Sequence, residues 1–474
     1  MITHIVNKAF FKSPTGTSRL DAEYAELSLY KVEALLLTKG NAKPLINYCS
    51  SYSGPAISKD YSKAESLFRY IPIDAVDNQD GLIFPDELIF SERPSRAKYE
   101  VAEGDIIVSN VRPNRNTVAL IGDRESKSIA SSGYTLLKLN RAAPFTPEFL
   151  FVYLKTSYAI KQLLRRNRGS MYPAVVAEDI FTTVIPSFSS QFVSKITKKV
   201  KKGLIEKADF FQNLDKAEQK LNKFLKTYGA PPSPLESNKT GLDCTIVTRD
   251  SFYKTDGAMR FDAEFFRSEY VEFNSRVIEN GSHFLLGEYY DLSPGSGLGK
   301  AKGEVVFFKQ GCLSNYGINW ASVGKEPGQL LENGSDVQEG DILLACTAHE
   351  IFYVGRKVDL VRGLPDELKD NKAVCDLLVI RAKVDKPASL PNSYVASFLR
   401  SDAGRHQVQR CIRGLRGGHV YARDLARFVR IPIPDKKLLV EYESLISVAE
   451  LNKNKYTATI KGCIKDIEKH LDSL

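Results

Sequence analysis

The chain repeats itself, and this internal duplication constrains its fold more than any other feature of the sequence. The segment Arg19–Tyr24 (RLDAEY) recurs as Arg260–Phe265 (RFDAEF), and Val101–Ile107 (VAEGDII) recurs as Val337–Leu343 (VQEGDIL). The offset of roughly 240 residues is too long for a solenoid repeat and suits duplicated domains. A chain of 474 residues is also too long for one compact core. We therefore expect two domains of the same fold.

Further landmarks follow in the same order in both copies. Each copy continues with a β-rich stretch, an amphipathic helix that begins near a proline, an Arg- and Gly-rich loop, and an apolar strand that ends in proline. Such an interleaving of strands and helices predicts the α/β class, here as a mixed α+β fold. The β-rich stretches are 129–139 and 373–382, the helices begin near Pro147 and Pro391, and the last strands end at Pro186 and Pro434.

A long helix is predicted behind each copy. Apolar residues at three- and four-residue spacing predict helices over 189–228 and 436–474, with Ala208 and Ala217 filling gaps in the first stripe. Such a stripe marks a coiled-coil seam or a face packed on a domain. Gly229 and the prolines of 231–234 end the first helix. The expected organisation is a domain over 1–188, a helix over 189–228, a linker over 229–245, a domain over 246–435 and a helix over 436–474.

Basic charge is concentrated in three parts of the chain. The net charge is +9, while segments 189–228, 161–170 and 400–430 carry surpluses of six, four and six positive charges. The rest of the chain is therefore net acidic by seven. Concentrated basic charge suggests a polyanionic partner, and a solvated basic face is the open alternative.

The chain shows no signal for a membrane or for a structural metal. No apolar run approaches the ~18 residues of a membrane helix, and residues 1–10 do not form a signal peptide, so we expect a cytoplasmic protein without a membrane partner. The seven cysteines include no CxxC pair, so we expect buried free thiols and no metal site.

The motifs and their order resemble the specificity subunits of type I restriction-modification systems. The resemblance is carried by the duplicated EGDI turns, the RxDAE openings, the closure from Met171 to Pro186 and the long helix after each domain, and it covers essentially the whole chain. Val108–Pro113 (VSNVRP) follows the first EGDI turn. The second copy departs from this pattern, with Ala345–His349 where the first has Ser109–Pro113. Divergent loops on a shared frame fit two domains that read different sequences.

The resemblance implies two target-recognition domains separated by long helices that form an antiparallel coiled coil. Each domain would bind one half of a bipartite target in double-stranded DNA. The helices would dock methyltransferase (modification) subunits, expected as a pair, and a translocase-nuclease restriction subunit could join them. S-adenosylmethionine would bind the partner methyltransferase, while this chain would hold no cofactor and no catalytic residue.

Arginine and asparagine side chains near the predicted turns are candidates for DNA contact in the first domain. Arginine donates paired hydrogen bonds to guanine, and asparagine does the same with adenine. For Arg165, Arg166 and Arg168 a solvated helix end is the alternative. The candidates are Arg112, Asn114, Arg115, Asn116, Arg165, Arg166, Arg168, Ser170 and Tyr172.

In the second domain the candidates lie in or after Gly-rich segments, where a flexible backbone could approach phosphate closely. They are Lys300, Lys302, Arg413, Arg416 and His419. Arg405 and Arg410 are expected at most to position the duplex, and His349 fits a packed or surface histidine equally well. The lysines at 198–202 could run near phosphates or form the solvated face of a coiled coil.

Two other functions stay open at this point. Pro85-Asp86 and Glu125-Ser126-Lys127 have the letters of a metal-dependent nuclease site, in which carboxylates hold Mg²⁺, although the second copy has no counterpart. A duplicated nucleic-acid-binding regulator outside restriction-modification is the non-enzymatic alternative. Gly295–Lys300 does not have the spacing of a nucleotide-binding loop.

Overall fold

The structure is a computed structural model of the chain. It describes residues 24, 26–52, 66–168, 172–229, 260, 263–295, 298–313, 316–320, 323–330, 337–348, 354–368, 372–374, 377–413 and 418–474. The predicted linker therefore lies outside the described residues, except for Gly229.

The chain divides into two compact units. Unit 1 comprises Met1–Asp209 and Leu451–Leu474, and unit 2 comprises Phe210–Glu450. The boundaries fall inside two long helices, α5 (Ser190–Lys226) and α12 (Lys436–Asp472), because part of each helix packs with each unit. These helices occupy the stretches in which the sequence predicts them.

Unit 1 is built on two four-stranded sheets whose apolar side chains form one core, which includes Ile71, Ile107 and Ala130. The first sheet is antiparallel and has the order β2 (Cys49–Tyr52), β9 (Tyr134–Leu139), β6 (Ile106–Ser109) and β7 (Val118–Leu120). The second has the order β4 (Asp86–Ile89), β3 (Leu67–Ile71), β8 (Ile129–Ser131) and β5 (Ala97–Glu100), with β3 parallel to β8.

Short helices and one further strand pair complete unit 1. Thr146 and Thr156 accept hydrogen bonds from the amides of Phe149 and Ala159, and these caps start two helices one after the other. The first of them packs on β7, and α1 packs on the second. The elements are α1 (Leu27–Thr38), α2 (Pro147–Leu154), α3 (Ser157–Arg165) and α4 (Ala177–Phe181), with β1 (Lys43–Pro44) paired to β10 (Val184–Ile185).

Unit 2 has corresponding strands in the same chain order, although its second sheet has three strands in place of four. Its antiparallel sheet has the order β12 (Tyr290–Pro294), β19 (Leu377–Ala382), β15 (Ile342–Ala345) and β17 (Val358–Leu360). A second sheet has β14 (Gly324–Leu330), β13 (Leu298–Phe308) and β18 (Lys372–Val374), and β11 (His283–Leu285) pairs with β21 (Arg430–Pro432). The helices are α7 (Ser268–Asn280), α8 (Leu286–Tyr289), α9 (Asn392–Arg400), α10 (Asp402–Arg410) and α11 (Ala422–Phe428).

The duplication predicted from the sequence is confirmed at the level of single hydrogen bonds. In the two EGDI turns, Gly104 and Gly340 have φ angles of 85° and 88°, in the left-handed region that glycine adopts without strain. Asp105 accepts the amide N–H of Ala102 at 2.9 Å, and Asp341 accepts that of Gln338 at 2.7 Å. The two copies of this motif therefore form the same turn for the same reason.

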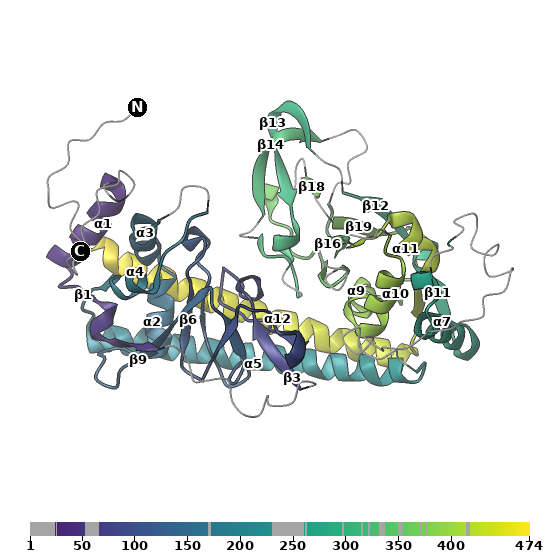
Figure 1. Cartoon of the computed structure of the whole chain (residues 1–474), viewed down its shortest axis with the longest axis horizontal. Helices are drawn as coiled ribbons and strands as arrows, with labels where there is room; N and C mark the ends of the chain where they lie inside the picture. Colours follow the sequence, from purple (N-terminus) through teal and green to yellow (C-terminus); the bar gives the residue numbers. More distant parts are fainter. Residues whose placement is uncertain are drawn as a thin grey trace. The chain divides into compact units, whose positions relative to one another are not determined.

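The long helices run antiparallel within unit 1, where α5 and α12 lie side by side (Figure 1). Lys199 pairs with Asp466 at 2.6 Å, whereas Glu206, further along α5, accepts a hydrogen bond from Thr459, earlier in α12. Within unit 2, Lys220 of α5 pairs with Glu441 of α12 at 2.5 Å. The mixed α+β fold with an antiparallel helix pair is therefore present as predicted.

One detail of the predicted helix stripe is wrong. Ala208 does not fill a gap in the stripe, because it is exposed. The neighbouring Lys207 is buried instead and forms an ion pair of 2.9 Å with the buried carboxylate of Glu125. A lysine can take such a place when an opposite charge accompanies it into the interior.

Two further sequence expectations concern the cysteines and membrane spans. Cys49, Cys312, Cys346, Cys411 and Cys463 are buried, as predicted, and burial raises the pKa of Cys411 to about 12. Over the residues that the structure describes, none of the helices combines the length and the apolar character needed to cross a bilayer.

The two glycines of the helix pair in unit 1 provide a matched test of its packing. A Cβ atom at Gly203 would lie 3.1 Å from Thr459 Cγ2, whereas one at Gly462 would meet nothing within 4 Å. Gly203→Leu should lower the free energy of unfolding by about 1–3 kcal/mol, because the helices must move apart. Gly462→Leu should raise it by up to about 1 kcal/mol through helix propensity. Thermal unfolding followed by circular dichroism compares the two; equal effects would contradict the packing described.

Candidate nucleic-acid interface

In unit 1, two loops meet where strand β6 ends. Residues 109–116 follow β6, and residues 167–175, described at 167–168 and 172–175, lead to α4. Backbone hydrogen bonds join them, from Arg112 N to Pro173 O at 2.7 Å and from Val175 N to Asn110 O at 2.8 Å. We call these two segments loop pair 1.

The first of these loops has an unusual backbone. Arg112 and Asn116, on either side of a 3₁₀ turn over Pro113–Arg115, have φ angles of 51° and 54°. A left-handed conformation costs a residue with a side chain roughly 1–2 kcal/mol. Such strain persists only where the surroundings enforce it, and it is frequent at functional sites.

The outward side chains of loop pair 1 are suited to base recognition. Asn114 and Arg115 are exposed, and Tyr172 is 68% exposed. The guanidinium carbon of Arg112 lies 6.0 Å from the centre of the Tyr172 ring. The structure therefore brings together four residues that the sequence predicts as DNA contacts. Their arginine and asparagine groups are those that form paired hydrogen bonds with purine edges.

Asn116 does not take part in this outward surface. Its side-chain Nδ2 donates to Lys155 O at 2.9 Å, and its Oδ1 is buried. The prediction that Asn116 contacts DNA is corrected, because the amide faces the interior and holds the loop in place.

Arg168 ties the second loop to α4. Its Nε and Nη2 donate to the two carboxylate oxygens of Asp179 at 2.8 and 2.9 Å, and Asp179 also accepts the amide N–H of Val176. The hydrogen bonds that Arg168 donates to Asp179 raise the pKa of Arg168. The guanidinium is half exposed, while the carboxylate is largely buried. The ion pair with the buried carboxylate of Asp179 therefore fixes the position of the Arg168 side chain at the surface.

Unit 2 has the equivalent pair of loops, which we call loop pair 2 (residues 345–348, 412–413 and 418–420). Strand β16 (Thr347–Ala348) pairs with β20 (Gly418–His419), and Val420 N donates to Cys346 O at 3.0 Å. Arg413 forms the same two hydrogen bonds with Asp424, at 2.6 and 3.1 Å, as Arg168 forms with Asp179. The backbone bond between the two loops and the arginine–aspartate ion pair are therefore present in both units.

The outward residues of loop pair 2 differ from those of loop pair 1. Position 348, which corresponds to Arg112, is alanine. The backbone pairing brings Arg413 beside His419, whose ring lies 4.5 Å from that of Tyr421. Lys300 and Lys302 lie on strand β13, in the hairpin with β14, and not in a loop. Ser170, Arg416 and His349 lie outside the described residues.

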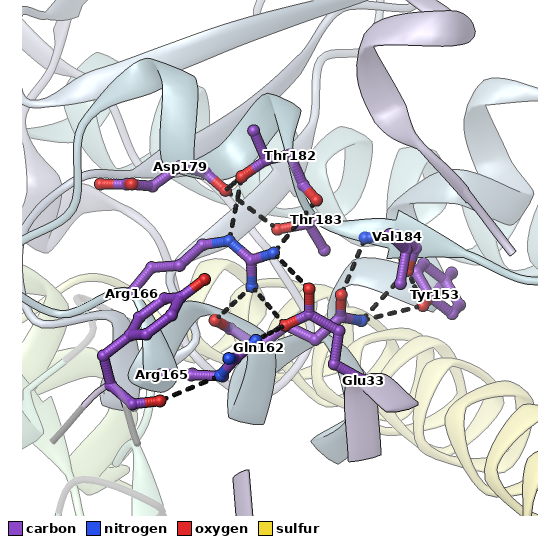
Figure 2. Close-up of polar contacts among 10 residues, drawn as sticks. Glu33, Tyr153, Gln162, Arg165, Arg166, Asp179, Thr182, Thr183 and Val184 are labelled. Carbon is purple, nitrogen blue, oxygen red and sulfur yellow. Dashed lines mark hydrogen bonds and ion pairs between the residues drawn. The ribbon is translucent and has the colours of Figure 1, made fainter. Parts of the chain in front are cut away.

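Arg165 and Arg166 were predicted as DNA contacts, and the structure contradicts this. Their exposed fractions are 1% and 2%, and both guanidinium groups pair with the buried carboxylate of Glu33, at 2.7 and 2.9 Å (Figure 2). Arg166 also donates to Thr182 Oγ1 at 2.9 Å and to Gln162 O at 2.9 Å. The two arginines fasten α3 to α1 and to the end of α4.

The second unit keeps only part of this network. Arg165 donates to Tyr24 O and covers its ring, and Arg410 does the same with Phe265, the residue directly after the second RxDAE motif. At the positions of Glu33 and Arg166, however, the sequence has Asn274 and Cys411. Unit 2 therefore lacks one negative and one positive charge of this network. The net charge of the buried groups at these two positions is the same in both units. Burial lowers the pKa of Arg410 to about 10.

Many of the basic side chains in the three charged segments form ion pairs with carboxylates of the same unit. In the Arg-rich stretch 400–430, Arg400 pairs with Asp359 and Arg405 with Asp402. On α5, Lys199 pairs with Asp466, whereas Lys198 and Lys202 are exposed. Charge clustering in the sequence therefore overstates the basic surface offered to a polyanion.

The nuclease alternative finds no support at its predicted residues. Glu125 is buried; one carboxylate oxygen pairs with Lys207 and the other accepts the amide N–H of Gly122. Within the described ranges, no three acidic, histidine or cysteine side chains gather as a metal site.

Sequence reasoning missed Lys155. This lysine follows α2, is 2% exposed and donates to three backbone carbonyls below loop pair 1. The only signal was a lysine directly after the apolar run FLFVYL, which is not distinctive, because lysine is common at helix ends.

No family model and no curated protein matches the chain. Similar solved structures belong to the class of specificity subunits of type I restriction-modification systems. One is the HsdS subunit from Thermoanaerobacter tengcongensis, with 18% identity, coverage of 92% of this chain and 96% of that chain, and a TM-score of 0.32. Another is the S subunit from M. genitalium, with 10% identity, coverage of 91% and 94%, and a TM-score of 0.29.

A third neighbour comes from a study of complex assembly and conformational transition in the type I R-M system. Its identity is 20%, it covers 91% of this chain and 94% of that chain, and its TM-score is 0.30. Such TM-scores do not establish a common fold, so the assignment of two equivalent units rests on their internal geometry.

The buried arginine pair provides a stability test. Glu33→Gln leaves two guanidinium groups without their anion and should lower the free energy of unfolding by about 3–5 kcal/mol. The exposed Glu103→Gln should change it by less than about 0.5 kcal/mol. The double variant Glu33→Asn, Arg166→Cys, which copies unit 2, should lose less than Glu33→Asn alone. Denaturant unfolding measures all four variants; an additive double variant would contradict the pairing.

Proposed function

We propose that this chain is the DNA sequence-recognition (specificity) subunit of a type I restriction-modification complex. Each unit would bind one half of a bipartite target in double-stranded DNA, with loop pair 1 and loop pair 2 as reading surfaces. The observation that supports this most is that both units share the EGDI turn, the arginine–aspartate ion pair and the backbone bond between the loops, whereas their outward residues differ. A repeated frame with varied contacts is what two different half-sites require.

The division of roles follows from the chemistry of the side chains. Arg112 and Asn114 would contact base edges, and the half-exposed Arg168 and Arg413 would meet the backbone or bases from fixed positions. The long helices, whose residues belong to both units, would set the spacing of the half-sites and dock a pair of methyltransferase subunits. A translocase-nuclease subunit would join the complex where it restricts DNA.

The chain itself would be non-catalytic and act in the cytoplasm. S-adenosylmethionine would bind the partner methyltransferase and supply the methyl group, and no residue of this chain would hold it. Methylome sequencing of a host that carries this gene and its neighbours tests the assignment. We expect one split motif with an unspecified spacer; an unsplit motif or no motif would overturn the proposal.

Arg112→Ala should impair recognition of one half-site only. In the complex with the methyltransferase partners, discrimination at the first half-site should fall by about 1–3 kcal/mol, while discrimination at the second should stay the same. Arg141→Ala removes the same charge from an exposed position after β9, at the other end of the sheet, and should change neither. Competition binding with singly substituted duplexes makes the comparison; equal losses at both halves would contradict independent units.

The purified chain should leave duplex DNA intact in the presence of Mg²⁺. The reason is that the nuclease-like Glu125 is committed to Lys207 inside unit 1. Gel electrophoresis after prolonged incubation is the measurement, and a nuclease-treated sample is the positive control. Cleavage by the pure chain that Glu125→Gln abolishes would favour the nuclease alternative.

A further inference from the structure

The inference concerns Lys155, which lies at the end of α2, beneath loop pair 1. Its side chain is buried, and its Nζ donates to Asn78 O at 2.9 Å, Asn116 O at 3.3 Å and Val118 O at 3.5 Å. A lysine ammonium has three N–H groups and no acceptor. All three donors are therefore matched by backbone carbonyls, and one of these belongs to the last residue of the strained loop.

Two hydrogen bonds join Lys155 and Asn116, and each residue is the donor of one of them. While Nζ donates to the backbone carbonyl of Asn116, the side-chain Nδ2 of Asn116 donates to the backbone carbonyl of Lys155 at 2.9 Å. The other end of the loop is fixed by the bond from Arg112 N to Pro173 O. The two left-handed residues are thus each held by a partner outside the loop.

The turn below Lys155 supplies the opposite charge. Burial is the largest influence on the pKa of Lys155 and lowers it, whereas Asp80 and Asp77 raise it by attracting the ammonium group; the resulting pKa is about 8. Asn78, between them, accepts a hydrogen bond from Thr117 at 2.8 Å, next to the end of the loop. Tyr456 of α12 donates to Asp80 O at 2.9 Å, so the turn is itself fixed within unit 1.

Unit 2 has a different residue at this place. Arg400, the last residue of α9, is the counterpart of Lys155 and donates to Val358 O at 3.0 Å, as Lys155 donates to Val118 O. It also donates to Asp359 Oδ1 and to Ser397 Oγ. In loop pair 2, Ala348, the counterpart of Arg112, lies in the strand β16 and does not adopt a left-handed conformation. The buried lysine that donates to three backbone carbonyls, which we call the lysine clamp, therefore occurs in the unit whose loop contains the left-handed Arg112.

We propose that Lys155 is a positioning residue for DNA recognition by unit 1: its buried ammonium group holds the loop 112–116 in the conformation that reads the first half-site, without contacting DNA. This inference rests on the proposed function. Without the clamp, Asn116 would relax toward ordinary negative φ, and the outward groups of Arg112 and Asn114, which lie in the turn that Asn116 closes, would lose their fixed direction.

The test uses the full complex and competition binding to duplexes with single substitutions in either half-site. Lys155→Met keeps the length of the side chain and removes the donors. Discrimination at the first half-site should fall about tenfold, the order of one lost paired base contact, and discrimination at the second should be unchanged. Arg400→Met, the matched control in unit 2, should leave the first half-site unchanged.

A second variant keeps the test decisive if Lys155→Met does not fold. Asn116→Gly suits the positive φ angle and removes only the bond to Lys155 O, so it should lower discrimination at the first half-site in the same direction. Unchanged discrimination in a folded Lys155→Met or in Asn116→Gly, or equal loss at both half-sites, would overturn the positioning role. Absence of discrimination by the wild-type complex would instead overturn the proposed function.

Discussion

A buried aspartate at the start of a short helix holds each pair of loops in this protein, and the rest of the site depends on it. Asp179 and Asp424 each accept two hydrogen bonds from an arginine that lies eleven residues earlier. A buried carboxylate must be paired, so the loop cannot leave it without a large cost. This requirement fixes the path of the chain between helix and loop, and the backbone bonds to the neighbouring loop follow from that path.

The two units show which parts of such a frame can change. The carboxylate clamp and the EGDI turn occur in both copies, whereas Glu33 and Arg166 are replaced together by Asn274 and Cys411. A buried ion pair can be exchanged for neutral groups as a pair, but loss of one partner leaves an uncompensated charge. Outward side chains are solvated and need no buried partner, so they can change one at a time. Arg112, for example, has alanine as its counterpart in unit 2. Stability therefore preserves the frame and leaves the reading surface free to diverge.

The sequence predicted the fold well and the site in part. Duplicated motifs and apolar periodicity indicated two copies of one fold and located the helices α5 and α12, because these signals depend on local spacing. Arg112, Asn114 and Arg115 lie in one turn because the local sequence specifies it, whereas the approach of Tyr172 to Arg112 results from folding. Arg165 and Arg166 were wrongly predicted as surface residues, because arginine in a basic cluster resembles a solvated face until its buried partner is known. That partner, Glu33, lies more than a hundred residues earlier.

The sequence by itself determined that the chain folds as two copies of one mixed α+β frame, each followed by a long amphipathic helix. These properties follow from repeat offset, periodicity and turn chemistry, which are readable over short windows. Only the tertiary structure decided which cations are buried and which face outward. Lys155, Lys207 and Arg166 owe their places to carboxylates or carbonyls brought close by folding. The direction of a long charged side chain depends on such distant partners, and no local pattern encodes them.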